Sequence, residues 1–374
     1  MKFIHTADLH IGKTVNEFSM LEEQRHVLKQ IRDIAVEEQA KAVVIAGDVY
    51  DRSVPSTEAV TLLDLFLTSL SEEGIPVILI SGNHDSGERV AFADRILEKQ
   101  GLYIAGGYDG RLKQVTFRDE WGNVVFTCMP FVKPAVATVE EMLSATPMTL
   151  DLMTRRVLVT HYFVTGEDGQ QPELSDSETT VNVGGLDNVS ASFFAAFDYV
   201  ALGHIHKRQR IGERQVWYAG APLKYSFSEV SQQKSVNVVT LGRKGEVTVE
   251  ARTLTPLHDF RIIEGKLKQL ILPEIVGAAD KEDYIKAVLT DTEELVDPIG
   301  TLRSVYPHVM VLERKRQGER DTDGYEAALS MSGGTPGELF TKFYELLNEE
   351  PMDERRLSII EELDKVLREG RYDT

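Results

Sequence analysis

Five short polar groups, each directly after an apolar run, are the residues of this sequence best suited to carry chemistry. They combine carboxylate, imidazole and amide side chains, and they contain five of the nine histidines. A single Asp-x-His or Gly-Asp motif is weak evidence, because turns use the same residues. Five such motifs in order after apolar runs predict one shared site. The groups are Asp8-Leu9-His10, Gly47-Asp48-Val49-Tyr50-Asp51, Gly82-Asn83-His84-Asp85, Thr160-His161-Tyr162 and Gly203-His204-Ile205-His206.

This donor set suits divalent metal ions of intermediate hardness. Carboxylates, imidazoles and an amide oxygen, without a thiolate, favour manganese, iron or zinc. The share of histidine is too high for a calcium site or a magnesium-only site. If two ions lie ~3.5–4 Å apart, one carboxylate must bridge them. Asp48 is the candidate for this bridge, because it is central in the order of the groups.

The spacing within the groups indicates how the side chains reach one site. Asp8 and His10 are two residues apart, so an extended strand end would point both to the same face. The His204/His206 pair repeats this spacing. A glycine before a candidate ligand allows a sharp turn and a close approach of the ions. The glycines in this position are Gly47, Gly82 and Gly203.

The elements that must position these groups form an α/β pattern. Strand–helix–strand alternation predicts parallel strands in a layered domain, whose polar groups leave one edge of a sheet. Ser56 or Thr57 is the expected N-cap of the second helix. Residues 166–192 are rich in Gly, Asp, Ser and Asn, and a loop is expected there. We expect strands at 2–5, 42–46, 76–80, 157–160 and 199–202, helices at 23–39 and 56–70, and hairpin strands at 215–219, 235–241 and 247–253.

Changes in composition divide the chain into four predicted parts. Residues 1–255 form the main domain, 256–315 a smaller α+β unit, and 316–335 a charged linker containing glycine. Residues 336–374 are expected to form two amphipathic helices separated by Pro351. Their apolar positions are Leu339, Phe340, Phe343, Tyr344 and Leu347, then Leu357, Ile360, Leu363 and Leu367.

Composition limits the classes of partner and compartment. No run of 18 apolar residues occurs, and the first residues lack the apolar core of a signal peptide, so we expect a cytoplasmic protein with no membrane contact. The single cysteine, Cys128, excludes an internal disulfide and lies in an apolar run typical of a buried strand. A net charge of −19 argues against tight autonomous binding to nucleic acid.

The ordered motifs resemble the calcineurin-like metallophosphoesterase superfamily. Within it, residues 3–10, 199–206 and 218–227 are similar to the SbcD family, the nuclease subunits of bacterial SbcCD complexes. The resemblance implies a layered metallophosphoesterase β-sandwich flanked by helices, with an α+β capping domain and a C-terminal helical tail. It also implies a two-metal DNA nuclease of repair, recombination and replication. With the SbcC ATPase, this family has ATP-dependent double-strand exonuclease and single-strand or hairpin endonuclease activity.

The resemblance also implies roles for individual residues. Two divalent ions, Mn²⁺ in first place, would share Asp48. His84 matches the catalytic histidine that contacts the scissile phosphate without binding metal, and Asp51 occupies the position of its carboxylate partner. One ion would be held by Asp8, His10, Asp48 and His206, and the other by Asp48, Asn83, His161 and His204.

Contacts with DNA and with proteins are further expectations from the resemblance and from charge. A basic run after the last ligands suggests DNA contacts, although a solvated turn explains it equally well. The tail helices resemble those that dock on an SbcC-type ATPase, and helices at 56–70 and 88–100 resemble those that pair two copies of the protein in a homodimer. Both sets of apolar faces also fit ordinary intramolecular packing. The basic residues are Lys207, Arg208, Arg210 and Arg214.

Two rival functions use the same metal site. A stand-alone phosphodiesterase for small esters would need the same ligands, but it would need neither a cap nor a docking tail. A DNA-end scaffold for an ATPase, with catalysis secondary, is the third hypothesis, and an intact ligand set argues against it. The hundred or so residues after Thr255 favour the nuclease.

Overall fold

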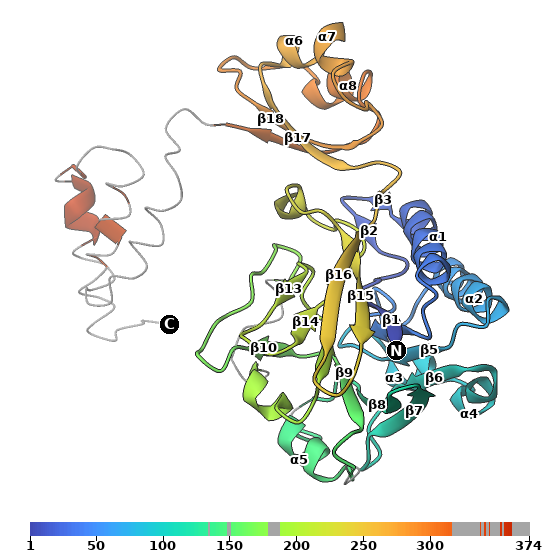
Figure 1. Ribbon diagram of the computed structural model, residues 1–374. Helices are drawn as coiled ribbons and strands as arrows, with labels where there is room; N and C mark the ends of the chain where they lie inside the picture. Colours follow the sequence, from blue (N-terminus) through green and yellow to red (C-terminus); the bar gives the residue numbers. More distant parts are fainter. Residues whose placement is uncertain are drawn as a thin grey trace. The chain divides into compact units, whose positions relative to one another are not determined.

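The computed structural model describes residues 1–133, 135–147, 151–178 and 188–315, together with 337, 340–341, 344, 352–353 and 355–360. Its main feature is a pair of six-stranded sheets packed face to face. The strand orders are β16-β15-β1-β4-β5-β6 and β13-β14-β12-β9-β8-β7. The chain therefore has the expected layered α/β fold (Figure 1).

The first sheet has a parallel half and an antiparallel half. Its parallel strands β1 (Lys2–Thr6), β4 (Val43–Ala46), β5 (Val77–Ile80) and β6 (Leu102–Ala105) pair in that order. All residues of β4 and β5 are buried, as expected for strands covered on both faces. The hairpin of β15 (Ser235–Leu241) and β16 (Val247–Thr253) joins the other side of β1 in antiparallel register.

The second sheet carries the remaining strand ends of the site. Strands β8 (Gly122–Met129), β9 (Arg155–Thr160), β12 (Tyr199–Leu202) and β14 (Val216–Tyr218) are parallel neighbours. Strands β7 (Lys113–Asp119) and β13 (Gln209–Arg210) close the two edges in antiparallel register. The predicted hairpin strand at 215–219 is present as β14, which pairs in antiparallel register with β13 in this sheet, whereas β15 and β16 form their hairpin in the first sheet.

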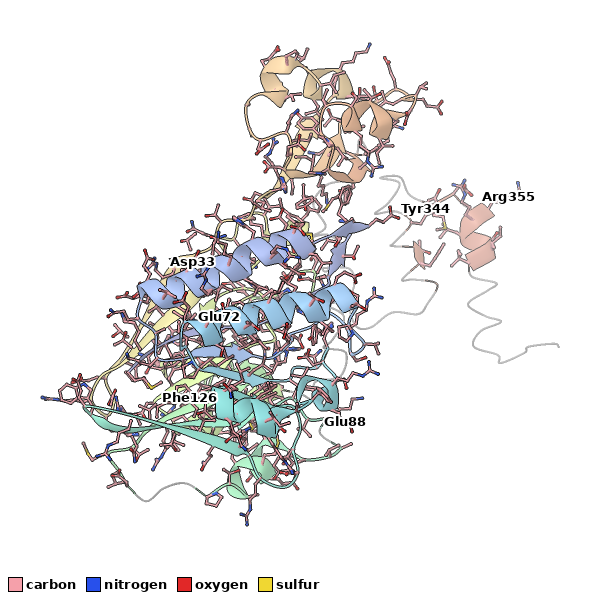
Figure 2. The ribbon with its side chains drawn as sticks, turned by 90° about the vertical axis from the view of Figure 1, so that its right-hand side faces the viewer. Asp33, Glu72, Glu88, Phe126, Tyr344 and Arg355 are labelled. Carbon is pink, nitrogen blue, oxygen red and sulfur yellow. The ribbon has the colours of Figure 1, made fainter. Side chains whose placement is uncertain are left out.

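Three apolar layers hold the sheets and helices together. Phe3, Val44, Phe126 and Tyr199 belong to the core between the two sheets. Helices α1 (Leu21–Glu37) and α2 (Thr57–Glu72) cover the outer face of the first sheet, and Ser56 caps α2 by accepting from the Ala59 amide. Figure 2 shows these two helices side by side. The outer face of the second sheet packs against α5 (Val139–Ser144) and the turn η2 (Ala191–Phe194).

Two other sequence expectations need correction. The helix expected at 88–100 is broken into α3 (Gly87–Val90), α4 (Asp94–Leu97) and η1 (Glu98–Gln100). Gly87 lies so close to the Gly106 carbonyl that a Cβ there would come within 1.7 Å, and the chain then turns at Ala93 with φ +60. The expected loop at 166–192 contains the short strand β11 (Asn188–Ser190), which pairs with β10 (Phe163–Thr165).

A smaller α+β unit follows the main sheets. The parallel strands β17 (Phe260–Gly265) and β18 (Tyr284–Leu289) are joined in one sheet by β19 (Val309–Arg314). Helices α6 (Leu267–Leu270), α7 (Pro273–Val276) and α8 (Pro298–Arg303) accompany them, and α6 and α8 pack on this sheet around Ile285 and Leu302. The remaining short strands are β2 (Thr14–Val15) and β3 (Phe18–Ser19), and the remaining turn is η3 (Phe227–Glu229).

Residues 314–374 form a separate compact unit. Its described residues 337, 340–341, 344 and 355–360 are helical, while Pro351 lies outside the described residues and the two-helix tail at 336–374 stays a prediction. Residues 316–335 of the predicted linker lie outside the described residues, as do Leu339, Phe343, Leu347, Leu363 and Leu367. Among the described residues, no helix is both long and apolar enough to cross a membrane.

A buried arginine ties the two sheets together at the end opposite the site. Arg155, at the start of β9, is only 1% exposed and forms a bidentate ion pair with Asp119 at the end of β7. Its guanidinium also donates to the Leu241 and Gly242 carbonyls of the first sheet at 3.3 and 3.0 Å. One side chain therefore satisfies a carboxylate and backbone oxygens from both sheets.

We expect Arg155→Met to lower the free energy of unfolding by ~3 kcal/mol, because it removes one partner of a largely buried pair and takes a donor from the Gly242 carbonyl. Urea unfolding followed by circular dichroism would measure the change. The exposed Arg118 on β7 supplies the matched control Arg118→Met, for which we expect a change within about 0.5 kcal/mol. An equal loss of stability in both variants would contradict the role of Arg155 as a clamp, that is, as a side chain that joins the two sheets.

Candidate metal centre

The five polar groups meet at one edge of the paired sheets. Asp8, Asp48 and Asn83 follow β1, β4 and β5 of the first sheet, while His161 and His204 follow β9 and β12 of the second. All five strands are parallel to a neighbour and end at the same edge, where open α/β sheets collect ligands. The structure brings together every residue that the sequence analysis assigned to metal binding.

Asp48 lies at the centre of the cluster. Its Oδ2 is 3.4 Å from His161 Nε2, 3.6 Å from His10 Nε2 and 3.9 Å from His84 Nε2. Its other oxygen, Oδ1, accepts a hydrogen bond from the His84 amide at 3.0 Å. Only 2% of the residue is exposed. A carboxylate in this position reaches ligands on both sides of the cluster, as a bridging group must.

The first half of the cluster contains Asp8, His10 and His206. Their ligand atoms lie within 4.8 Å of one another, and all three residues are buried. The His10 and His206 Nε2 atoms are 3.1 Å apart. Asp8 Oδ2 is buried without a hydrogen-bond partner. An unsatisfied buried carboxylate oxygen between imidazole nitrogens is costly for the chain alone, and it fits coordination to a cation.

The second half of the cluster is built around an amide oxygen. Asn83 Oδ1 lies 3.1 Å from His161 Nε2 and 3.0 Å from His204 Nδ1. His161 Nδ1 lies 2.8 Å from the Ala46 carbonyl and can donate to it, which would leave Nε2 to act as a ligand. These residues fit the predicted second ion, with Asp48 shared between the halves.

The backbone that aims the ligands differs from the expected extended strand ends. Asp8, His10, Asp48 and His204 have positive φ angles of 54, 44, 49 and 96°. The interpretation of Asp8 and His10 as i and i+2 of a strand is therefore wrong, since β1 already ends at Thr6. Non-glycine residues in this region are strained, and such strain clusters at functional sites.

The expected glycines do allow close approach, but to neighbouring protein atoms. A Cβ on Gly82 would lie 2.1 Å from Asp48 Oδ1, and one on Gly203 would lie 2.0 Å from the Ala46 carbonyl. At Gly47, where φ is +87, it would lie 2.3 Å from His161 Nδ1. The glycines let the ligand loops of the two sheets close on one another.

Burial and mutual charge shift the pKa values of the cluster in opposite directions. Burial raises the pKa of Asp8 to about 7 and lowers that of His204 to about 3. Burial also opposes the charged forms of Asp48 and His161, but their mutual attraction outweighs it. The pKa of Asp48 falls well below its usual range, and that of His161 rises to about 9. A divalent cation would replace the proton on His161 as the counter-charge.

His84 lies beside the cluster but its partner is not the predicted one. Its Nδ1 faces the backbone carbonyl of Asp51 at 3.0 Å. The Asp51 carboxylate instead accepts from Lys13 Nζ at 2.7 Å and lies 3.8 Å from His10 Nδ1. The expected carboxylate–histidine pair is therefore corrected to a carbonyl–histidine contact. His84 Nε2 still points to the metal side, and 36% of the side chain is exposed.

Sequence reasoning missed the residues that hold the ligand loops. The Asp85 carboxylate accepts from the amides of Val49, Tyr50 and Gly82 at 3.1, 2.9 and 2.8 Å, which joins the loops after β4 and β5. The Tyr225 hydroxyl donates to the Leu9 carbonyl at 2.6 Å. Asp85 could have been noticed because it belongs to one of the five polar groups. Tyr225 lies in residues 218–227, which resemble the SbcD family, but the resemblance gives this tyrosine no role.

A buried relay orients His206. Its Nδ1 lies 2.9 Å from Ser177 Oγ, and this hydroxyl donates to Glu229 Oε1 at 2.9 Å. Glu229 is fully buried and pairs with Lys234 at 2.5 Å. Glu178 accepts from the His206 amide. With Nδ1 donating to the serine, Nε2 faces His10 as a ligand nitrogen, an arrangement common around metal-bound histidines.

The basic run after the ligands is largely engaged within the protein. Lys207 pairs with Glu173, and Arg214 pairs with Glu167 at 2.6 Å. Arg208 donates to Asn237 Oδ1 at 2.5 Å and stacks on Trp217. Arg210 Nε donates to the Arg214 carbonyl at 2.9 Å. The DNA contacts of these residues stay a prediction.

Comparison with known proteins gives two family matches. The profile of the calcineurin-like phosphoesterases matches residues 1–208. The profile described as the type 5 capsule protein repressor C-terminal domain matches residues 256–347.

Two relatives are both described as the SbcD subunit of the nuclease SbcCD. The protein of Staphylococcus epidermidis is 32% identical over 327 residues, which cover 83% of this chain and 85% of that protein. The protein of Staphylococcus saprophyticus is 34% identical over 327 residues, covering 83% and 84%. A solved dimetal phosphatase from Danio rerio has a TM-score of 0.37 at 12% identity, covering 68% of this chain and 99% of that chain. This last similarity is too weak to support an argument.

We expect Ser177→Ala to weaken Mn²⁺ binding about 10- to 100-fold, because it removes the acceptor that fixes the His206 ring. Equilibrium dialysis with metal analysis would measure it. Ser228→Ala is the matched control. Ser228 Oγ accepts from the Asp176 amide at 3.0 Å, so it anchors the chain segment next to Ser177 by a bond that does not involve His206. Equal weakening in both variants would assign the effect to docking of the segment and not to the ring.

Proposed function

The chain belongs to the calcineurin-like phosphoesterases and to the SbcD family of SbcCD nuclease subunits, and from this membership we propose that it hydrolyses phosphodiester bonds of DNA. The observation that carries the proposal is the convergence of seven ligand side chains at one edge of the sheets, with the buried Asp48 carboxylate at their centre. They are Asp8, His10, Asp48, Asn83, His161, His204 and His206.

The proposed centre holds two divalent ions. Asp8, His10 and His206 would bind one, Asn83, His161 and His204 the other, and Asp48 both. Such a pair of ions lowers the pKa of a bound water and polarises the phosphate. Manganese is our proposal for the metal, because the donor set has carboxylate, amide and imidazole ligands without a thiolate. The chain itself supplies the fixed geometry through Asp85, Gln24 and Tyr225, which bind the backbone of the ligand loops.

His84 is the proposed catalytic acid. The Asp51 carbonyl accepts from Nδ1, so a protonated ring directs its Nε2 proton towards the reaction side. The His84 amide is anchored to Asp48 Oδ1, which fixes the ring beside the central carboxylate. A proton delivered there stabilises charge on the leaving oxygen. Asp51 contributes through its carbonyl and through the Lys13 ion pair.

Several observations favour DNA over a small ester as the substrate. A second unit follows the phosphoesterase domain, and its match covers residues 256–347. Relatives that share this organisation are described as subunits of a nuclease. We therefore propose an SbcC-type ATPase as partner, docked by the C-terminal helices, with double-stranded ends and hairpins as substrates. A partner would also supply the attraction that a chain of net charge −19 lacks.

A homodimer remains part of the proposal. Phe92 and Ile96 are 81% and 70% exposed, so they do not belong to an intramolecular core. On α2, Val60 and Leu65 are also exposed, at 44% and 50%. Exposed apolar side chains of this size are typical of interaction surfaces.

We expect the purified chain with Mn²⁺ to cleave end-labelled duplex and hairpin DNA, more rapidly when the partner ATPase and ATP are present. Asp48→Asn should reduce cleavage by at least about 10³-fold, because it removes the shared carboxylate. A small chromogenic phosphodiester runs alongside. If the chain hydrolyses the small ester but not DNA, even when the partner is present, the function would be that of a stand-alone phosphodiesterase and not of a nuclease.

We expect His84→Ala to lower kcat for DNA cleavage about 10²- to 10⁴-fold while both metal sites keep their metal. Metal analysis of the dialysed variant separates this role from a ligand role. His84→Gln should remain similarly impaired, since an amide cannot deliver a proton. Loss of one metal equivalent would show that His84 is a metal ligand. The His84 ring is close enough for that role, because its ligand atom lies within 4.8 Å of those of His10 and Asp48.

A further inference from the structure

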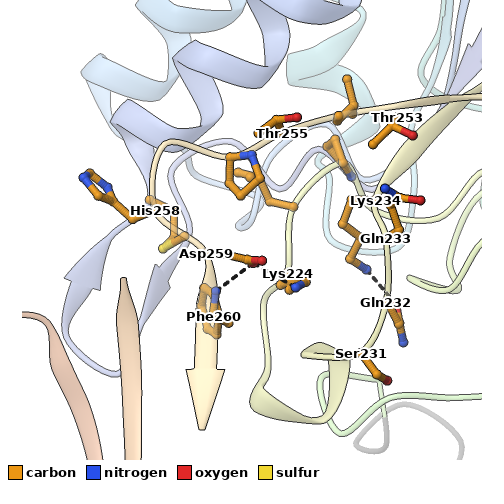
Figure 3. A pocket seen from close by; sticks show the side chains of 15 residues that line it. Lys224, Ser231, Gln232, Gln233, Lys234, Thr253, Thr255, His258, Asp259 and Phe260 are labelled. Carbon is orange, nitrogen blue, oxygen red and sulfur yellow. Dashed lines mark hydrogen bonds and ion pairs between the residues drawn. The ribbon is translucent and has the colours of Figure 1, made fainter. Parts of the chain in front are cut away.

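A polar pocket of about 280 Å³ borders the candidate metal centre. Three chain segments line it: the turn after β12, the loop after β14 and the turn before β15. Lys207, Arg208 and Lys234 contribute cationic side chains, and Gln232 and Gln233 contribute amides. Figure 3 shows the 231–234 turn from the neighbouring pocket, with Lys234 bonded to Gln232.

The pocket has no acidic residue in its lining, although the chain has 60 acidic against 41 basic residues. Two of its cations have counter-charges outside the pocket. Lys234 pairs with buried Glu229, and Lys207 pairs with Glu173. Arg208 is the third cation of the lining.

Arg208 is a cation without a carboxylate partner among the described residues. Its Nε donates to the neutral Asn237 side chain at 2.5 Å, and its guanidinium stacks on Trp217 at 4.7 Å from the ring centre. These contacts fix the plane of the guanidinium and leave its terminal nitrogens for another acceptor. An arginine is always charged, and a partly buried charge gains from an anionic partner.

The pocket and the candidate metal centre share one residue, His206. His206 belongs to both, since its ring faces His10 while its carbonyl accepts from Lys234 Nζ at 2.9 Å in the pocket wall. A Cβ on Gly220 would lie 2.7 Å from the Arg208 amide, so glycine is needed for the wall to close. His206 therefore connects the pocket directly to the candidate metal centre.

We propose that this pocket is a phosphate subsite, in which Arg208 binds a phosphodiester flanking the one that is cleaved. The inference rests on the proposed nuclease function and assigns one strand contact within it. A planar guanidinium held by stacking suits bidentate binding of phosphate oxygens. Gln232 and Gln233 supply amide donors at the same mouth. The net effect is to hold the strand locally against the repulsion of an acidic chain.

The test uses the full chain with Mn²⁺ and a fluorescein-labelled duplex of phosphorothioate linkages, which resists cleavage. We expect Arg208→Gln to bind it about tenfold less tightly and to lower the slope of log K against log salt by about 0.9, the value for one phosphate contact. Arg208→Lys should keep the slope but lose part of the affinity, because lysine lacks the planar fork.

A second variant guards against misfolding of Arg208→Gln. Gln233 is exposed at the pocket mouth, so Gln233→Glu adds a negative charge without removing a packed group. We expect it to lower DNA affinity about fivefold or more by repulsion. The exposed Gln114 on β7 gives the matched control Gln114→Glu, which changes the total charge equally but should leave binding and cleavage unchanged.

The outcomes separate this inference from the proposed function. Unaltered affinity and salt slope in both Arg208→Gln and Gln233→Glu would overturn the subsite, even if the unmodified chain cleaves DNA. An equal loss in Gln114→Glu would also overturn it, since total charge would then explain the effect. Failure of the proposed function would appear differently, as an unmodified chain that cleaves the small diester but not DNA.

Discussion

The structure depends on two carboxylates, Asp8 and Asp48, that are buried at the meeting edge of two sheets. Removing ionised carboxylates from water is expensive unless charges and donors surround them. The chain supplies part of this compensation through the amides of His204 and His84, which donate to Asp8 and Asp48 at 2.8 and 3.0 Å. The rest comes from cations, either protonated histidines or metal ions, or from a proton on Asp8, whose pKa burial raises to about 7. The ring of imidazoles around the two residues follows from this requirement.

The same requirement explains the strain of the surrounding backbone. Asp8, His10, Asp48 and His204 all have positive φ, a conformation that costs free energy for residues other than glycine. The strain persists because the neighbouring elements over-determine it: Asp85, Gln24 and Tyr225 bind the loop backbone, and the glycines allow contacts that no Cβ would permit. Stability elsewhere, as in the Arg155 clamp between the sheets, offsets this cost.

Much of the fold and of the site could be predicted because the signals are local. The strand before Asp48 is a continuous apolar run and those before Asp8 and His161 contain shorter ones, and the ends of parallel strands meet whatever the details of the loops. The positive φ angles of Asp8, His10, Asp48 and His204 could not be predicted, since only a few per cent of non-glycine residues adopt that region and tertiary contacts decide which ones do. The left-handed turn at Ala93 and the close approach of Gly87 to Gly106 at the end of β6 likewise have no local signal in the sequence. Ser177 and Glu229 are 52 positions apart, so their relay to His206 exists only after folding.

The distribution of charge links the fold to the proposed chemistry. A chain of net charge −19 repels nucleic acid at long range, so any attraction must be local and must act after encounter. Two of the four cations of the basic run, Lys207 and Arg214, are paired with glutamates and therefore contribute little field. Arg208 differs because its contacts are with an amide and an indole, which orient the charge without neutralising it. Metal ions at the sheet edge and one oriented guanidinium beside them would concentrate positive potential where a phosphate backbone is cut. Capture of the strand from solution would then fall to a partner protein, which is consistent with a chain that acts within a complex.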